Sequence, residues 1–96
     1  MIGVLVTFEG SEGLDRAALT GIAESARGMF EGMPGLRSKS FTVADDGSRA
    51  RNFYLWDDEE KARAFFTDEM RGQIAEVYGV TPDIELLAVL SYVDNA

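Results

Sequence analysis

The sequence contains no histidine and no cysteine, and these absences remove several common kinds of active site. Without histidine, a Ser-His-Asp triad, a histidine general base and a histidine-rich metal site are impossible. Without cysteine there is no disulfide framework and no thiolate chemistry. Haem held by a proximal histidine or cysteine is excluded for the same reason. The missing histidines exclude more chemistry than any other feature of the composition.

Basic side chains are also scarce, since 9 Lys and Arg stand against 17 Asp and Glu for a formal net charge of −8. Nucleic-acid-binding proteins need basic residues to offset phosphates, and anionic membrane surfaces attract basic segments. We therefore expect neither partner. The sequence also lacks a run long enough to span a bilayer and the charged flank of a signal peptide, so a cytoplasmic protein is expected.

What is present predicts one α+β domain over residues 1–96, with 46% apolar residues to form its core. Hydrophobic periodicity and turn residues locate the elements. In chain order we expect a strand at 2–8, a loop at 9–13, a helix at 16–30, a strand at 36–44, a hairpin turn at 45–48, a strand at 49–56, a helix opening at 57–60, a short helix at 71–78 and a strand at 84–93. This β-α-β-β-α-β order is the ferredoxin-like unit, in which the helices lie on one face of a four-stranded antiparallel sheet.

Acidic side chains precede the predicted helices. Asp15 is expected to cap the first helix, because its carboxylate can accept a bond from a free backbone N–H group. Asp57 is expected to cap the second, with Glu60 at the capping-box position. We interpret the acidic run 57–60 as a helix start and predict no metal site, because the carboxylate spacing matches no Mg²⁺ or Ca²⁺ cage.

The predicted sheet is apolar on both faces. If one face met water, alternate strand residues should be polar. Instead, apolar residues occupy both faces of each predicted strand. In the first strand Val4, Val6 and Phe8 share one face and Leu5 lies on the other. In the third, Phe53 and Leu55 share one face and Tyr54 and Trp56 the other; in the last, Leu86, Ala88 and Leu90 share one face and Leu87, Val89 and Val93 the other. We therefore predict that two sheets pack face to face in a homodimeric α/β barrel.

Several segments resemble a known group of proteins. They are Met33-Pro34-Gly35-Leu36, Lys39, Tyr54-Leu55-Trp56, the pair Ala62 and Phe65, and Gly79-Val80-Thr81-Pro82. With them, nearly the whole chain resembles the dimeric α/β-barrel superfamily, and within it the YdhR-type monooxygenases. One departure is the segment Arg51-Asn52-Phe53, where that group tends to have glycines. The resemblance implies a cavity between the sheet and its helices, in which some members oxidise polycyclic or quinol-like substrates without metal or flavin.

Three side chains of the strand at 49–56 share one face at a period of two, namely Asn52, Tyr54 and Trp56. They predict an aromatic pocket wall with an amide that orients a carbonyl or phenol oxygen. The alternative interpretation is ordinary core or interface packing, in which the polar tips are bonded or wet.

Other polar residues add to this set. Arg37 and Lys39 alternate with serines and could bind an acidic or enolate oxygen of a substrate, although we favour a strand edge kept soluble by charge. Tyr78 is a candidate phenol at the pocket mouth, a donor because a phenol pKa is about 10. The candidate substrate-binding residues are Asn52, Tyr54, Trp56, Arg37 and Tyr78, and no catalytic residue is assigned.

Two classes of function fit these features. The first is a cofactor-independent monooxygenase-like enzyme that acts on an aromatic or quinol-type small molecule and uses no metal, flavin or haem. The alternative is a non-catalytic module that binds a small molecule or only forms a structural dimer. Both remain open at the level of the sequence.

Overall fold

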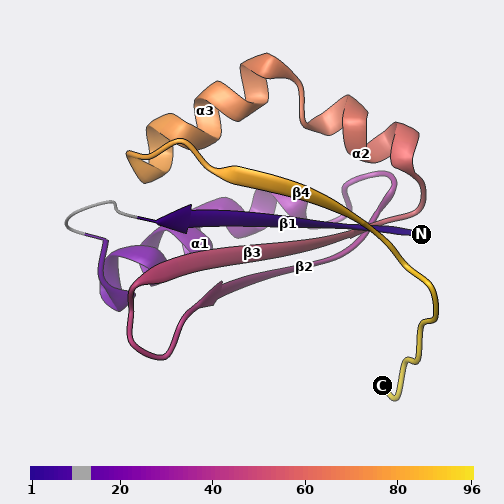
Figure 1. Cartoon of the computed structure of the whole chain (residues 1–96), viewed down its shortest axis with the longest axis horizontal. Coiled ribbons are helices and arrows are strands. Elements are labelled where there is room, and N and C mark those ends of the chain that lie inside the picture. Colours follow the sequence, from indigo (N-terminus) through magenta and orange to yellow (C-terminus); the bar gives the residue numbers. More distant parts are fainter. Residues whose placement is uncertain (10–13) are drawn as a thin grey trace.

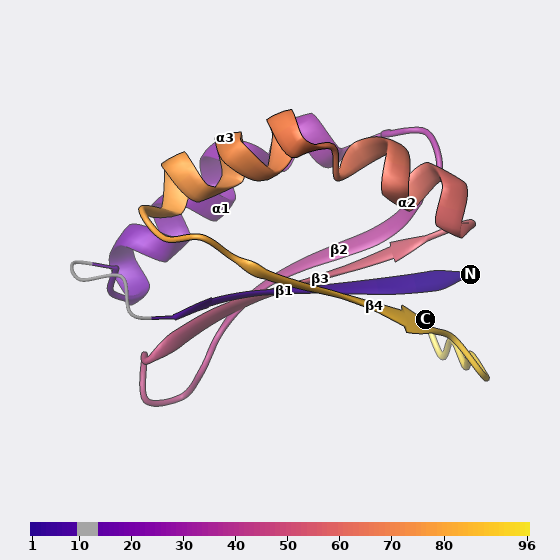
Figure 2. The same ribbon diagram turned by 45° about the horizontal axis from the view of Figure 1, so that its top comes forward.

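The computed structural model describes residues 1–9 and 14–96, and the predicted loop at 9–13 lies outside them except for Glu9. Its elements in chain order are β1 (Ile2–Glu9), α1 (Arg16–Phe30), β2 (Leu36–Val43), β3 (Arg49–Trp56), α2 (Glu59–Phe65), α3 (Asp68–Tyr78) and β4 (Asp83–Ala88). The predicted α+β class and β-α-β-β-α-β order are confirmed. Figures 1 and 2 show the helices together over one face of the sheet.

The four strands form one antiparallel sheet in the order β2-β3-β1-β4. Its central pair is β1 and β3, where Val4 lies opposite Tyr54 and Val6 opposite Asn52. Strand β4 pairs with the other edge of β1, from Asp83 to Ala88. β1 and β3 are therefore the central strands, and β2 and β4 form the two edges.

The helix caps account for where the helices begin. Asp15 caps α1 as predicted, and its carboxylate accepts a bond from the Ala18 backbone N–H at 2.8 Å. The predicted cap at Asp57 is wrong: Asp58 caps α2 and accepts from the Lys61 N–H at 2.8 Å. The Asp57 N–H is instead bonded to the Gly35 carbonyl at 2.8 Å, which delays the helix by one residue.

Two further boundaries differ from prediction. Helix α3 begins at Asp68 rather than residue 71, because the Thr67 hydroxyl accepts a bond from the Met70 N–H and caps it. Strand β4 ends at Ala88 rather than residue 93. Ala88 lies opposite Ile2, the first residue of β1, so the chain beyond it finds no strand to pair with. The segment 89–96 leaves the sheet toward the C-terminus in Figure 1.

The core lies between the sheet and the helices. Alternate residues of β1 are almost completely buried there, with Val4 and Val6 at 0% exposure and Phe8 at 2%. The aromatic rings of Tyr54, Trp56 and Phe66 complete this layer, and most of them meet edge to face or offset. Burying rings in this way provides most of the apolar area that stabilises a small domain.

The other face of the sheet carries no helix. Strand alternation points the next set of side chains to this side, and four of them form what we call the outer patch: Leu5, Phe53, Leu55 and Leu87. Phe53 and Leu87 are 37% and 38% exposed. The Phe53 ring lies over Gly3, where an added Cβ would meet it at 2.8 Å. Polar residues surround the patch, among them Ser40, Thr42, Arg51 and Glu85.

Candidate functional site

The face of β3 toward the helices presents the three candidate residues predicted to line a pocket. Asn52, Tyr54 and Trp56 are 3%, 2% and 2% exposed. Tyr54 and Trp56 stack with their rings 9° from parallel and their centroids 6.2 Å apart. The structure thus places all three side chains in the layer between the sheet and the helices. The sequence alone did not show which face of the strand they would occupy relative to the helices.

A buried polar pair joins β3 to α3. The Asn52 side-chain amide donates a hydrogen bond to the Tyr78 hydroxyl at 3.0 Å. The Tyr78 ring stacks on Phe8 with centroids 3.7 Å apart, so it lies flat on the floor of the sheet. Burial raises the pKa of the Tyr78 phenol, and the bond from Asn52 partly opposes that shift. Tyr78 is therefore a neutral hydrogen-bonding group at neutral pH.

Lys39 of β2 turns toward the helices rather than to water. Its Nζ lies 3.5 Å from the centroid of the Phe30 ring, 4.1 Å from that of Phe41 and 4.2 Å from that of Tyr54. It also donates a hydrogen bond to the Tyr54 hydroxyl at 2.8 Å. The interpretation of Lys39 as a charged strand edge is therefore wrong.

The electrostatics of this lysine follow from its surroundings. Burial penalises the ammonium and lowers the pKa of Lys39 to about 7. The three ring faces attract the ammonium and so oppose the effect of burial. Burial also raises the pKa of Tyr54, so this phenol keeps its proton at neutral pH. Lys39 and Tyr54 together can offer an ammonium or amine beside a neutral hydroxyl.

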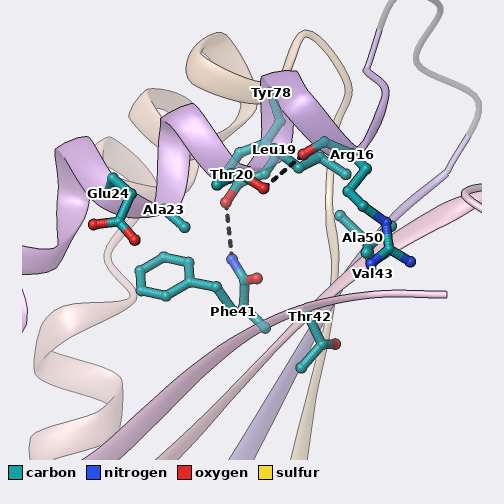
Figure 3. A pocket seen from close by; sticks show the side chains of 11 residues that line it. Arg16, Leu19, Thr20, Ala23, Glu24, Phe41, Thr42, Val43, Ala50 and Tyr78 are labelled. Atoms are coloured by element: carbon teal, nitrogen blue, oxygen red, sulfur yellow. Dashed lines mark hydrogen bonds between the residues drawn. The ribbon is translucent and has the colours of Figure 1, made fainter. Parts of the chain in front are cut away.

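Two cavities open between the helices and the sheet. We call the first the side cavity; it has a volume of about 230 Å³, with Leu19 and Thr20 of α1 on one wall and Phe41 of β2 on the other (Figure 3). Charged Arg16 and Glu24 also line it, which makes it the more polar of the two. Asn52 and Tyr78 line it as well.

The second, which we call the inner cavity, has a volume of about 140 Å³ and lies between α1, α3 and the sheet. Its walls are mainly apolar side chains from all three helices, including Phe30 of α1, Phe65 of α2 and Ile74 of α3. Lys39 and Tyr54 lie on its floor. Phe41, Asn52 and Tyr78 line both cavities, so the two adjoin at the Asn52–Tyr78 pair.

The two remaining candidates lie apart from these cavities. Arg37 is exposed and pairs with Asp57 at 3.7 Å. It lines an outer groove of about 280 Å³ beside the edge of β2, which Lys39 and Phe41 also line from the inside. Trp56 is buried beneath Phe65 and Phe66 and lines neither the inner nor the side cavity. The sequence prediction included Arg37 and not Lys39; strand alternation alone places both on one face, and the register shift between Leu36 and Ser38 changes that pattern.

Within residues 1–9 and 14–96, no three acidic side chains come close enough together to hold a metal ion. In the same part of the chain, no helix is long and apolar enough to cross a membrane.

Comparison with known proteins gives matches in structure only. No protein-family model and no curated protein matches the sequence. The structure matches NE2512 of Nitrosomonas europaea, a protein of unknown function, with a TM-score of 0.75 and 20% identity over 99% of this chain and 94% of that one. It matches Rv0793 of Mycobacterium tuberculosis with a TM-score of 0.73 and 16% identity over 97% and 98% of the two chains.

A third match is the monooxygenase ActVA-Orf6 of Streptomyces coelicolor, solved in complex with nanaomycin D. Its TM-score is 0.72, with 20% identity over 99% of this chain and 92% of that one. Each match covers nearly the full length of both chains. The comparisons thus confirm the fold that the resemblance to dimeric α/β-barrel proteins predicted, while the YdhR-type assignment stays a prediction.

Proposed function

We propose that this protein is a cofactor-independent monooxygenase-like enzyme that oxidises an aromatic or quinol-type small molecule with O₂. The observation that carries the proposal is the inner cavity, an apolar and aromatic space with Lys39 and Tyr54 on its floor. Small-molecule sites commonly combine such apolar walls with a few placed polar groups. The fold shared with a monooxygenase that binds nanaomycin D adds support.

In such a reaction the substrate supplies the electrons. In an anthrone-type substrate, a methylene carbon activated by a neighbouring phenol loses two hydrogens and gains one oxygen atom from O₂ to become a carbonyl. The second oxygen atom leaves with those two hydrogens as water, so four electrons pass from the carbon to O₂. The protein has to hold the substrate anion and exclude bulk water.

The polar groups of the cavities suit that task. The Lys39 ammonium and the Tyr54 hydroxyl lie 2.8 Å apart, so both can donate to one substrate oxyanion. Asn52 and Tyr78 can orient a second oxygen where the two cavities adjoin. Since an apolar cavity of about 150 Å³ holds one benzene ring, the inner cavity suits one ring, and a fused-ring substrate would extend into the side cavity.

We also propose that two copies pair through the outer patch and that the protein acts in the cytoplasm. The apolar centre and polar surroundings of the outer patch are those of a protein interface. Pairing there would leave the helices and both cavities on the outside of the dimer, so that each copy keeps its own site.

Oxygen uptake by the purified full chain tests the proposed activity. With anthrone-type and hydroquinone-type compounds we expect uptake above the uncatalysed rate, and at least a tenfold loss in a Lys39→Met variant. Lys61→Met is the matched control, because Lys61 is exposed on α2 and lines neither cavity. Folded protein that takes up no oxygen across both compound classes contradicts the proposal.

A non-catalytic binding module is the second candidate, and one observation favours it. Four polar groups of the cavities already bond each other in pairs, Lys39 to Tyr54 and Asn52 to Tyr78, as in a pocket that orients a ligand without reacting with it. This function predicts that aromatic ligands raise the melting temperature without any oxygen uptake. Side chains that fill both cavities in a crystal structure would instead indicate a purely structural dimer.

A further inference from the structure

The sequence contains only two lysines, and the structure places them in opposite surroundings. Lys61 lies on the surface of α2, where its side chain is 51% exposed and its Nζ is 3.8 Å from the Asp58 carboxylate. Lys39 lies between the sheet and the helices, with its Nζ among the rings of Phe30, Phe41 and Tyr54. The chain therefore carries one ordinary lysine and one enclosed lysine.

The enclosed amine has direct access to empty space. Lys39 lines the inner cavity on one side and the groove along the edge of β2 on the other. Among the described residues that line the inner cavity there is no carboxylate, and the other titratable groups are the phenols of Tyr54 and Tyr78. Besides Lys39, the charged residues that line the outer groove are Arg27, Glu31 and Arg37. Inside the cavity no acidic partner holds the amine as an ammonium ion.

A lysine without an acidic partner in an apolar pocket is a nucleophile. Burial lowers the pKa of Lys39 to about 7, so a substantial fraction of this amine is neutral at neutral pH. An exposed lysine with a pKa of about 10.4 is almost entirely protonated under the same conditions. The difference in free amine favours reaction at Lys39 even before the walls of the pocket contribute.

We propose that Lys39 is a carbonyl-binding site that captures single-ring aromatic aldehydes as an imine. The Nζ lone pair adds to the carbonyl carbon, and a proton moves from nitrogen to oxygen to give a carbinolamine. Loss of the remaining N–H proton and of the hydroxyl as water leaves a C=N bond. The balance is one aldehyde and one amine to one imine and one water, with no oxidant or reductant.

The residues around Lys39 account for this choice of ligand. The Tyr54 hydroxyl is 2.8 Å from Nζ and stays protonated, so it can donate to the carbonyl oxygen and polarise it. The rings of Phe30 and Phe41 can stack on an aromatic aldehyde. The volume of about 140 Å³ matches one ring. The site would operate whether or not the protein also reacts with O₂.

Reductive trapping with benzaldehyde and cyanoborohydride tests the inference on the native full chain. The reagent converts the imine into a stable benzylamine, which peptide mapping by mass spectrometry assigns to Lys39, Lys61 or the N-terminus. At neutral pH we expect Lys39 to gain a benzyl group at least tenfold faster than Lys61. The comparison is internal to one folded protein, so no variant has to fold for it to succeed. Equal or slower labelling of Lys39 overturns the inference.

Propanal, which has no ring, separates a pocket from a merely reactive amine. We expect the preference for Lys39 over Lys61 to be at least threefold greater with benzaldehyde than with propanal. If both aldehydes show the same preference, no aromatic site surrounds the amine and the inference fails. Lys39→Arg, which keeps the charge but forms no imine, should lose the fast labelling, whereas Lys61→Arg should retain it.

Discussion

Asn52 has to find a hydrogen-bond partner inside the protein, because it is buried with only 3% exposure. Its amide donates to the Tyr78 hydroxyl at 3.0 Å. Tyr78→Phe removes that hydroxyl and leaves the amide N–H buried without this acceptor. An unsatisfied buried donor costs about 1–3 kcal/mol. We expect urea unfolding to show a loss of stability in this range.

Tyr92→Phe is the matched control for that measurement. Tyr92 is 51% exposed in the segment after β4, so its hydroxyl can bond water and its loss should change the free energy of unfolding by less than about 0.5 kcal/mol. Equal effects of the two substitutions would show that the Asn52–Tyr78 bond contributes nothing to folding.

Lys39 should make the stability of the fold depend on pH. Its pKa is about 7 in the folded protein and about 10.4 in the unfolded chain. Between these values the unfolded chain binds a proton that the folded protein lacks, so stability rises with pH through this window. Below it both states are protonated, and the burial penalty applies in full.

The check is to follow the unfolding free energy of the native protein and of Lys39→Met from about pH 6 to about pH 9. The native protein should gain stability relative to the variant as the pH rises, by less than the limit of about 1.4 kcal/mol per pH unit, since solvent screens a partly exposed side chain. A difference that is flat or falls with pH contradicts a lowered pKa.

Sequence patterns located part of the site for a clear physical reason. Period-two alternation in β3 puts Asn52, Tyr54 and Trp56 on one face, and that holds for any straight strand. The role of Lys39 depends on rings from α1, β2 and β3 that meet only in the folded chain. A register shift between Leu36 and Ser38 also alters the alternation of β2 just before Lys39. No local pattern shows these features.

At the scale of elements, the start of α2 is set by the carboxylate of Asp58 and not by that of the adjacent Asp57. Asp58 accepts the Lys61 N–H, so Asp58→Ala should destabilise the protein by about 1 kcal/mol. Asp57→Ala is the matched control, because it keeps the backbone bond to Gly35 and loses only an exposed ion pair with Arg37. Thermal unfolding of both variants tests the assignment, and a larger loss for Asp57→Ala would contradict it.

Two glycines should respond oppositely to alanine. Gly21 lies in α1 with nothing within 4 Å of an added Cβ, so Gly21→Ala should stabilise the protein by about 0.5–1 kcal/mol. Gly35 precedes β2 with a φ of +83°, where an added Cβ would also meet the side chain of Lys61. Gly35→Ala should therefore destabilise it by at least about 1 kcal/mol. Denaturant midpoints of the two variants measure this, and a shift in the same direction for both would contradict it.

Element boundaries were predictable where one residue type decides them. Asp15 before an amphipathic stretch is enough to locate the start of α1. At α2 two aspartates are equally good caps, and the choice depends on the bond from Asp57 to Gly35, far away in the sequence. The start of α3 was missed although Thr67-Asp68-Glu69 has the composition of a helix start, with a hydroxyl cap and two acids in the first turn.

At the scale of the whole molecule, the end of β4 shows where local patterns fail. Residues 89–93 alternate well enough for a strand, but the pairing of β4 with β1 ends where Ala88 lies opposite Ile2, the first residue of β1. Leu90 and Val93 are consequently 96% and 76% exposed. The length of a strand thus depends on its neighbour in the sheet, which lies at the opposite end of the chain.

The outer patch bears on the last prediction, that the protein forms a dimer. Leu5, Phe53, Leu55 and Leu87 form a continuous apolar centre on a face with no helix over it. Each copy carries a net charge of −8, so two copies repel one another over long distances. Association should therefore tighten with salt, which screens the charges and leaves apolar burial unopposed.

Phe53→Glu and Leu87→Glu should each convert the protein to a monomer, because they bury a charge at the centre of the interface without a partner. Light scattering at micromolar concentration measures the mass. Val77→Glu is the matched control: Val77 is 59% exposed on α3, on the opposite side of the sheet, and its variant should remain dimeric. Circular dichroism separates dissociation from unfolding. A native protein that is already a monomer contradicts the dimer, and patch variants that stay dimeric would place the interface elsewhere.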